Sequence, residues 1–220
     1  MSQMTLSLAL FRRLLLGLCL ALASLSASAE PDRSPEQVIR DSIDELMSQV
    51  EGRKDHYANN IDELKALVDD NLDDIADFRY IGASVMGRYF QNATPQQRSR
   101  FVNVFRQTLI DTYTKGLVTF DYRELRVLDS QRASRHEDQA SVAMEVVAMD
   151  GAVYPVSYTL RQTDGQWKVV NVIVNGINLG LTFRNQFDQA MREQGRDYDA
   201  VIANWSPEIA AEELEEGGNA

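Results

Sequence analysis

Residue types that carry covalent or acid–base chemistry are scarce in this chain. Its 220 residues include two histidines, His56 and His136, and one cysteine, Cys19. The histidines lie in the polar stretches EGRKDHYANN and SRHEDQ, which are typical of loops, and Cys19 lies in an apolar stretch near the N-terminus. A catalytic histidine or cysteine needs a partner group held beside it in a cleft. The sequence offers no such arrangement around these three residues.

The short motifs that build common active sites are also missing. The chain has no G-x-S-x-G or H-E-x-x-H pattern, no glycine-rich loop for phosphates and no metal-ligand spacing. Carboxylates are abundant, but they fall on the solvent faces of the expected elements. Asp121 is the one carboxylate within an expected strand of alternating apolar residues. Its side chain points to the face opposite that of Phe120 and Tyr122. We therefore expect no enzyme, no metal and no cofactor.

The first 29 residues are typical of a signal peptide. Arg12 and Arg13 precede an apolar run over 14–25, and Ala27-Ser28-Ala29 matches a cleavage site. We expect cleavage after Ala29, export, and a mature protein without cysteine. No later stretch approaches the roughly 18 apolar residues of a membrane-spanning helix. The remaining chain is predicted to be one domain, 30–206, followed by an acidic disordered tail, 207–220.

The charge balance excludes some partners. The expected signal peptide holds two arginines and no acid, which leaves 20 Lys+Arg against 33 Asp+Glu and a formal charge of −13. Nucleic acids and anionic membrane surfaces repel such a protein. We expect a soluble monomer that binds no nucleic acid.

Helices are predicted before and after a sheet. Ser34-Pro35-Glu36-Gln37 and Thr94-Pro95-Gln96-Gln97 predict N-caps with capping boxes. Apolar residues at helical spacing predict helices over 34–51, 61–75, 78–90 and 94–115, with Gly116 as the residue after the last of them. After the sheet, a helix through Leu179, Phe183, Phe187 and Met191 and a short helix over 197–205 are expected.

From Leu117 onward the apolar period changes to two, which predicts strands. The apolar side chains of the first strand switch from one face to the other, which predicts a bulge near Arg123 or Glu124. A three-residue loop at Met149–Gly151, with the glycine left-handed, makes the apolar faces of the next two strands agree. It pairs Val146 with Tyr154, Met144 with Val156 and Val142 with Tyr158.

The same construction with a loop at Thr163–Gly165 sets the register of the last strand. It places Val170, Val172 and Val174 beside Tyr158, Val156 and Tyr154. Trp167, Val169 and Ile173 then point to the opposite face. A strand with apolar residues on both faces is expected to lie inside a sheet, not at its edge.

The sequence thus predicts an α+β fold with helices packed on a twisted antiparallel sheet of about four strands. Large apolar side chains on the helices and on one sheet face are expected to face each other. A filled core and a core with a cavity both fit these side chains, since composition does not separate them.

Two stretches resemble a known family. GRYFQNATPQQRSRFVNVFRQTLIDTY, over 87–113, and WKVVNVIVNGINLGLTFRNQF, over 167–187, are similar to the signature of the periplasmic phospholipid-binding proteins of the Mla (maintenance of lipid asymmetry) pathway, the MlaC or toluene-tolerance auxiliary family. The resemblance covers most of the mature chain in order. Asn178 stands where the family has a serine-like residue, and asparagine can also cap a helix.

The resemblance implies a fold distantly like nuclear transport factor 2 that encloses an apolar cavity for the acyl tails of a glycerophospholipid. It implies a carrier in the periplasm of a Gram-negative bacterium, working between an outer-membrane lipoprotein complex and an inner-membrane ABC transporter with a ring of MCE domains. The residues expected to line the cavity are Phe78, Ile81, Val85, Phe90, Phe101, Val104, Phe105, Leu109, Tyr113, Phe120, Tyr122, Val142, Met144, Val146, Tyr154, Val156, Tyr158, Val170, Val172, Val174, Leu179, Phe183 and Phe187.

A basic rim for a partner or a lipid headgroup is a further hypothesis, with ordinary solubilising arginines as its alternative. The rim would consist of Arg98, Arg100, Arg106, Arg184 and Arg192. Two other function classes stay open: an enzyme on a cone-shaped sheet, with Tyr122, Tyr154 or Tyr158 pointing inward, and a periplasmic chaperone or scaffold with a filled core.

Overall fold

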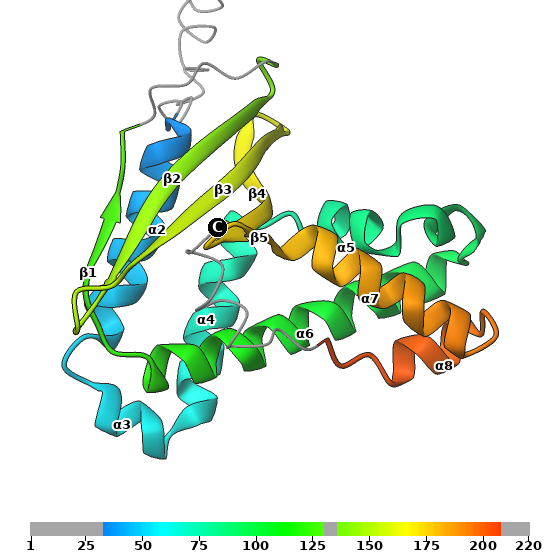
Figure 1. Cartoon of the computed structure of the whole chain (residues 1–220), viewed down its shortest axis with the longest axis horizontal. Coiled ribbons are helices and arrows are strands. Elements are labelled where there is room, and N and C mark those ends of the chain that lie inside the picture. Colours follow the sequence, from blue (N-terminus) through cyan, green and yellow to red (C-terminus); the bar gives the residue numbers. More distant parts are fainter. Residues whose placement is uncertain (1–32, 130–135, 208–220) are drawn as a thin grey trace, which may run out of the picture. The chain divides into compact units, whose positions relative to one another are not determined.

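The computed structural model describes residues 33–129 and 136–207 (Figure 1). The expected signal peptide and nearly all of the expected acidic tail lie outside these residues. The helices are α2 (Pro35–Val50), α3 (Lys54–Asn59), α4 (Ile61–Ile75), α5 (Phe78–Met86), the 3-10 helix η2 (Gly87–Asn92), α6 (Pro95–Thr119), α7 (Leu179–Glu193) and α8 (Tyr198–Ala203). The strands are β1 (Tyr122–Val127), β2 (Gln139–Ala148), β3 (Val153–Thr163), β4 (Gln166–Val174) and β5 (Ile177–Asn178).

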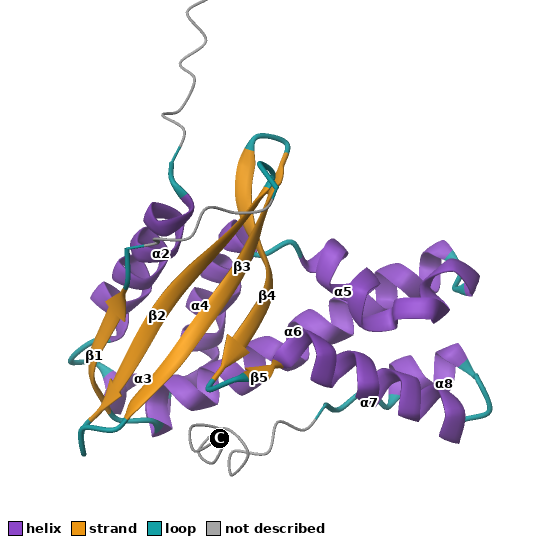
Figure 2. Cartoon of the chain, turned by 45° about the horizontal axis from the view of Figure 1, so that its top comes forward, coloured by secondary structure: helices purple, strands orange, loops and turns teal. Residues whose placement is uncertain are grey.

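The architecture is α+β, as predicted, with one more strand than expected. Five antiparallel strands follow the chain order β1-β2-β3-β4-β5 (Figure 2). β4 lies inside the sheet, because β3 and β5 flank it and Ala76 forms a bridge to Val169. No helix in 33–129 or 136–207 has the length and apolarity needed to cross a bilayer.

The predicted helix starts are confirmed by their hydrogen bonds. The side chains of Ser34 and Thr94 each accept a hydrogen bond from the backbone N–H three residues later. The side chains of Gln37 and Gln97 accept one from the backbone N–H of the cap residue. Asn178 caps α7, since its Oδ1 accepts from Leu181 N at 3.0 Å. Local sequence is sufficient at these points because a capping box joins residues only three positions apart.

Three helix predictions were wrong in part. Gly116 does not end α6, which continues to Thr119. The expected helix over 78–90 stops at Met86, since Gly87 takes a φ of 52° and a 3-10 turn follows. His56 lies in the helix α3 and not in a loop. Tertiary packing explains that helix, because Tyr57 is 2% exposed within an apolar cluster.

The β2–β3 hairpin has the predicted register. Val146 pairs with Tyr154, Met144 with Val156 and Val142 with Tyr158. Gly151 has a φ of 92°, the left-handed conformation that the three-residue loop needs. The predicted bulge is also confirmed, because the β1 register shifts between Tyr122 and Glu124.

The predicted register of β4 was wrong. Thr163 pairs with Gln166, so the turn has only two residues, Asp164 and Gly165, both with positive φ. A bulge then leaves Val170 without a strand partner, and Val172 pairs with Tyr158. The extra residue of the bulge shifts the alternation by one, so residues before and after it that were expected on opposite faces lie on the same face. Trp167 and Val169 therefore join Val172 and Val174 in one apolar cluster, not on opposite faces as predicted.

The two faces of the sheet differ. The inner face packs on α2 and α4 and carries a cluster that includes Val38, Ile39 and Val142. On the outer face, Arg126 Nη1 lies 2.8 Å from Glu145 Oε2, and the hydroxyls of Ser141 and Ser157 lie 3.2 Å apart. Any apolar ligand is therefore expected on the inner face.

A second apolar cluster lies among the helices α5, α6, α7 and α8. We call it the aromatic core, and its rings are those of Phe101, Phe105, Phe183, Phe187 and Trp205. The ring centroids of Phe101 and Phe187 are 4.8 Å apart, and those of Phe101 and Trp205 are 5.4 Å apart. Edge contacts of this kind favour a rigid, filled core.

The junction of β4 and α7 provides a stability test. Asn171 Oδ1 accepts from Gly180 N at 3.1 Å, and a Cβ at Gly180 would lie only 2.4 Å from that oxygen. Gly180→Ala should lower the free energy of unfolding by about 1–3 kcal/mol, because the bond breaks and a polar group is stranded. Denaturant unfolding followed by circular dichroism measures this.

Gly116→Ala is the matched control, since nothing lies within 4 Å of a Cβ there. Removing a glycine from a helix should stabilise the protein by up to about 1 kcal/mol. Equal effects of the two substitutions would contradict the proposed role of the Asn171 contact.

Candidate apolar ligand site

The structure places most of the predicted cavity residues in two apolar clusters. The residues from α5, η2, α6 and α7 belong to the aromatic core or pack against it: Phe78, Ile81, Val85, Phe90, Phe101, Val104, Phe105, Leu109, Leu179, Phe183 and Phe187. The sheet residues Val142, Met144, Val146, Val156, Tyr158, Val172 and Val174 form the cluster on the inner face. Five predicted residues belong to neither cluster: Tyr113, Phe120, Tyr122, Tyr154 and Val170. That all these residues line one cavity stays a prediction.

The aromatic core has little free surface. Phe101, Phe105 and Phe187 are each 0% exposed. Their rings contact one another and Trp205, so in this conformation they pack against protein. A role in lipid contact stays a prediction for this group, and it would require the helices to move.

The inner face of the sheet is covered less completely. Val142 is 0% exposed near α2, whereas Val146, Tyr154, Val172 and Val174 are only half-buried. These four residues lie toward the end of the sheet that meets the C-terminal half of α6. Open apolar surface is unfavourable by about 25 cal/mol per Å² in water. Its presence here favours a place that a ligand covers.

One face of α6 borders this region. Tyr113, Gly116 and Phe120 follow at intervals of three and four, so they share a face. Phe120 is 41% exposed, and its ring lies 6.0 Å from that of Tyr154 on β3. At Gly116 a Cβ would meet nothing within 4 Å. Gly116 is itself exposed, so the surface of α6 is open at this point.

Tyr113 combines free surface with a surrounding of protein. Its side chain is 44% exposed. Burial nevertheless raises the pKa of its hydroxyl, and the nearby Tyr122 raises it further. A side chain with free surface that is also surrounded by protein lines a recess of the structure. We call this recess the hollow and define it by Tyr113 and Gly116 of α6, by Phe120 directly after that helix, and by Tyr154 and Tyr158 of β3.

The hollow is poorly equipped for acid–base chemistry. Burial raises the pKa of both Tyr158 and Tyr122, which moves these hydroxyls further from neutral pH. In the described segments no group of three His, Cys, Asp or Glu side chains could hold a metal ion. The site is suited to binding an apolar molecule more than to transforming one.

The five arginines of the predicted rim all have partners within the chain. Arg98 Nε donates to Phe90 O at 2.9 Å, and its guanidinium lies 4.3 Å from the centre of the Phe90 ring. Arg184 Nε donates to Ser84 O at 2.7 Å. Arg192 Nη1 lies 2.7 Å from Asp188 Oδ2. The other arginines of the set join different elements around the aromatic core, whereas Arg192 pairs within α7, and the rim stays a prediction.

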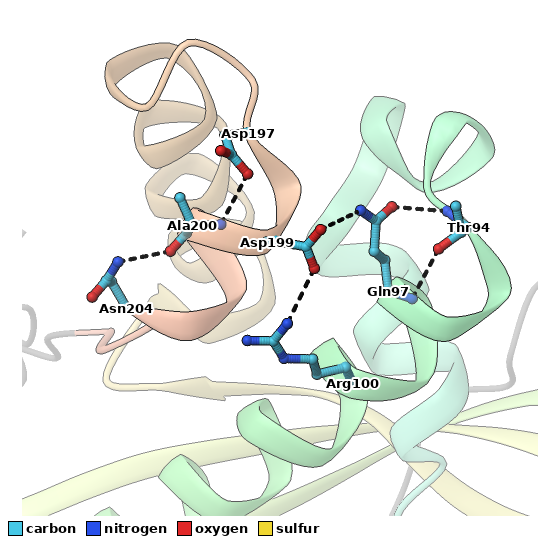
Figure 3. A network of polar contacts seen from close by, with 7 residues as sticks. All are labelled: Thr94, Gln97, Arg100, Asp197, Asp199, Ala200 and Asn204. Atoms are coloured by element: carbon cyan, nitrogen blue, oxygen red, sulfur yellow. Dashed lines mark hydrogen bonds and ion pairs between the residues drawn. The ribbon is translucent and has the colours of Figure 1, made fainter.

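Arg100 belongs to a network that fastens α8 to the start of α6. Arg100 Nη1 lies 3.1 Å from Asp199 Oδ1, and Gln97 Nε2 donates to the other oxygen of that carboxylate at 3.2 Å (Figure 3). Gln97 is also the capping-box partner of Thr94. The sequence signals the cap, but it does not signal Asp199, which lies 102 positions away from Gln97.

Arg106 provides a second test. Its Nη2 lies 2.8 Å from Asp69 Oδ1 and its Nη1 lies 3.1 Å from Asp73 Oδ1, both on α4. Its guanidinium also lies over the Phe78 ring. Arg106→Gln should lower the free energy of unfolding by about 1–2 kcal/mol, because two carboxylates lose their counter-charge.

Arg79→Gln serves as the control for thermal or denaturant unfolding. Arg79 is exposed, and the described part of the chain gives it no ion pair. Its loss should change stability by less than about 0.5 kcal/mol. If Arg106→Gln were equally mild, the bridge between α4 and α6 would be unimportant.

Comparisons with known proteins agree with this geometry. The model of the MlaC protein family matches residues 40–207. The toluene tolerance protein ttg2D of Pseudomonas putida is 36% identical over 204 residues, which cover 92% of this chain and 93% of that protein. The intermembrane phospholipid transport system binding protein MlaC of Haemophilus influenzae is 18% identical over 159 residues, covering 70% and 73%.

A solved structure shares the fold. It is that of a phospholipid-binding protein from Ralstonia solanacearum in complex with a phospholipid. The TM-score is 0.67 at 23% identity, and the match covers 83% of this chain and 96% of that one. At this identity the likeness shows the fold alone.

Proposed function

This chain belongs to the MlaC family, and on that premise we propose that it binds a glycerophospholipid by its acyl tails and carries it across the periplasm. The observation that carries this proposal is the hollow, where Tyr113 and Phe120 keep 44% and 41% of their surface exposed beside the half-buried apolar side chains of the sheet. The relatives support it, since one is described as a phospholipid transport system binding protein and another as phospholipid-binding.

The energetics of lipid transfer suit such a site. Burying a methylene group is worth about 0.8 kcal/mol, so two chains of roughly 15 carbons would lose on the order of 24 kcal/mol on bare extraction into water. A carrier must replace most of this lost free energy with apolar contacts to its own side chains. Valine, methionine and tyrosine walls do so without directional bonds, which lets the lipid leave again.

We propose the same partners and location that the family resemblance implies. The donor or acceptor complexes would be an outer-membrane lipoprotein complex and an inner-membrane ABC transporter with an MCE-domain ring. The net charge of −11 fits a carrier that docks on proteins, because anionic membrane surfaces repel it. We propose no catalytic residue.

The alternatives are less favoured. An enzyme would need an inward group that titrates near neutral pH, and burial moves the pKa values of Tyr122 and Tyr158 away from it. A chaperone or scaffold with a filled core does not explain why Tyr113 and Phe120 keep more than two fifths of their surface.

Filling the hollow tests the proposal. Gly116→Phe should add a large side chain to the open space on the Tyr113 face of α6, and we expect at least a several-fold loss of lipid uptake from vesicles while the protein stays folded. Gly116→Ala is the control and should bind lipid as the wild type does. Unchanged uptake by Gly116→Phe would place the acyl chains elsewhere.

A further inference from the structure

Three tyrosine hydroxyls converge on the hollow from different elements. Tyr113 comes from α6, Tyr122 from the start of β1 and Tyr158 from the middle of β3. Ionising Tyr113 would raise the pKa of Tyr158, and ionising Tyr122 would raise that of Tyr113. Such mutual effects require the hydroxyls to be close together. The hollow therefore has a polar patch within its apolar wall.

The hydroxyl donors of this patch lack strong acceptors in the protein. Tyr122 Oη donates to Met47 Sδ at 2.8 Å, and Tyr158 Oη lies 4.0 Å from Met144 Sδ. A thioether sulfur is a weak acceptor. Within 33–129 and 136–207 the structure gives the Tyr113 hydroxyl no hydrogen-bond partner. Leaving a surrounded hydroxyl without an acceptor is unfavourable, and phenylalanine would avoid this.

The charges near these hydroxyls indicate which kind of hydrogen-bond acceptor they would bind. Two opposite charges act on Tyr122, since Glu51 raises the pKa of its hydroxyl and Lys54, which lies over its ring, lowers it. The titratable neighbours that shift the pKa values of Tyr113 and Tyr158 are other tyrosines. A phosphate would bring a buried negative charge that these two neutral donors do not balance. An ester carbonyl accepts a hydrogen bond without a charge. A glycerophospholipid carries two such carbonyls, each at the start of an acyl chain.

We propose that the hydroxyls of Tyr113 and Tyr158 donate hydrogen bonds to the ester carbonyl oxygens of the bound lipid, an inference that rests on the proposed function. The two tyrosines lie on opposite walls of the hollow, one on the helix and one on the sheet, so each can reach one ester. They fix the depth at which the glycerol ester region stops and the apolar chains begin. The carrier thereby distinguishes ester-linked lipids from molecules with the same chains and no carbonyl.

The test compares two phosphatidylcholines that have the same chains, one ester-linked and one ether-linked, by displacement of a fluorescent phospholipid from the mature protein. Wild type should bind the ester form more tightly. Tyr113→Phe and Tyr158→Phe should each reduce the ester-to-ether preference by about 2- to 10-fold, the range for one hydrogen bond. The double variant should bind both lipids alike.

Tyr80→Phe is the control, since Tyr80 lies on α5, is 40% exposed and is not part of the hollow. It should keep the full ester preference. Equal binding of both lipids by the wild type, or an equal loss of both in the tyrosine variants, would overturn the proposed hydrogen bonds and leave the carrier function intact. Binding of neither lipid by the wild type would overturn the function as well.

Discussion

Unfilled apolar space is the constraint on which this structure depends. Each Å² of apolar surface left open near Tyr113 and Phe120 forgoes about 25 cal/mol of stabilisation, so the free energy of folding must come from elsewhere. The aromatic core supplies it at the other end of α6, where Phe101, Phe105 and Phe187 are fully buried.

α6 has 25 residues and is about 37 Å long. Its N-terminal half is packed into the core, and its C-terminal half borders the hollow. The helix therefore lets one end of the domain be filled while the other stays open.

The polar contacts follow the same division. Arg98, Arg106 and Arg184 hold helices around the aromatic core, and the network of Gln97, Arg100 and Asp199 fastens α8 there. Around the hollow, by contrast, the partners of the Tyr122 and Tyr158 hydroxyls among the described residues are the sulfur atoms of methionines. Ion pairs and well-aligned hydrogen bonds thus secure the part that stays fixed. Weaker contacts surround the part proposed to exchange a ligand, where strong directional bonds would hold either the lipid or the empty walls too firmly.

Local signals in the sequence were sufficient for much of the fold. The capping boxes at Ser34 and Thr94 join residues three positions apart, and Gly151 fixes the β2–β3 register because only one loop length makes the apolar faces agree. The register of β4 failed because the bulge at Val170 reverses the parity of Trp167 and Val169, and alternation alone does not reveal a bulge inside a doubly apolar strand. For the site, Phe101 and Tyr113 are similar aromatic residues on one helix, yet the first is buried and the second lines the hollow. That difference depends on contacts distant in sequence, as do the pairings of Arg100 and Arg184.

The most direct measurement is the lipid content of the wild-type protein, purified without detergent. Native mass spectrometry, followed by solvent extraction and identification of the released molecules, gives both stoichiometry and chemical class. The account predicts glycerophospholipid bound in a fixed ratio to the protein. A lipid-free protein that also takes up no phospholipid from vesicles would contradict it.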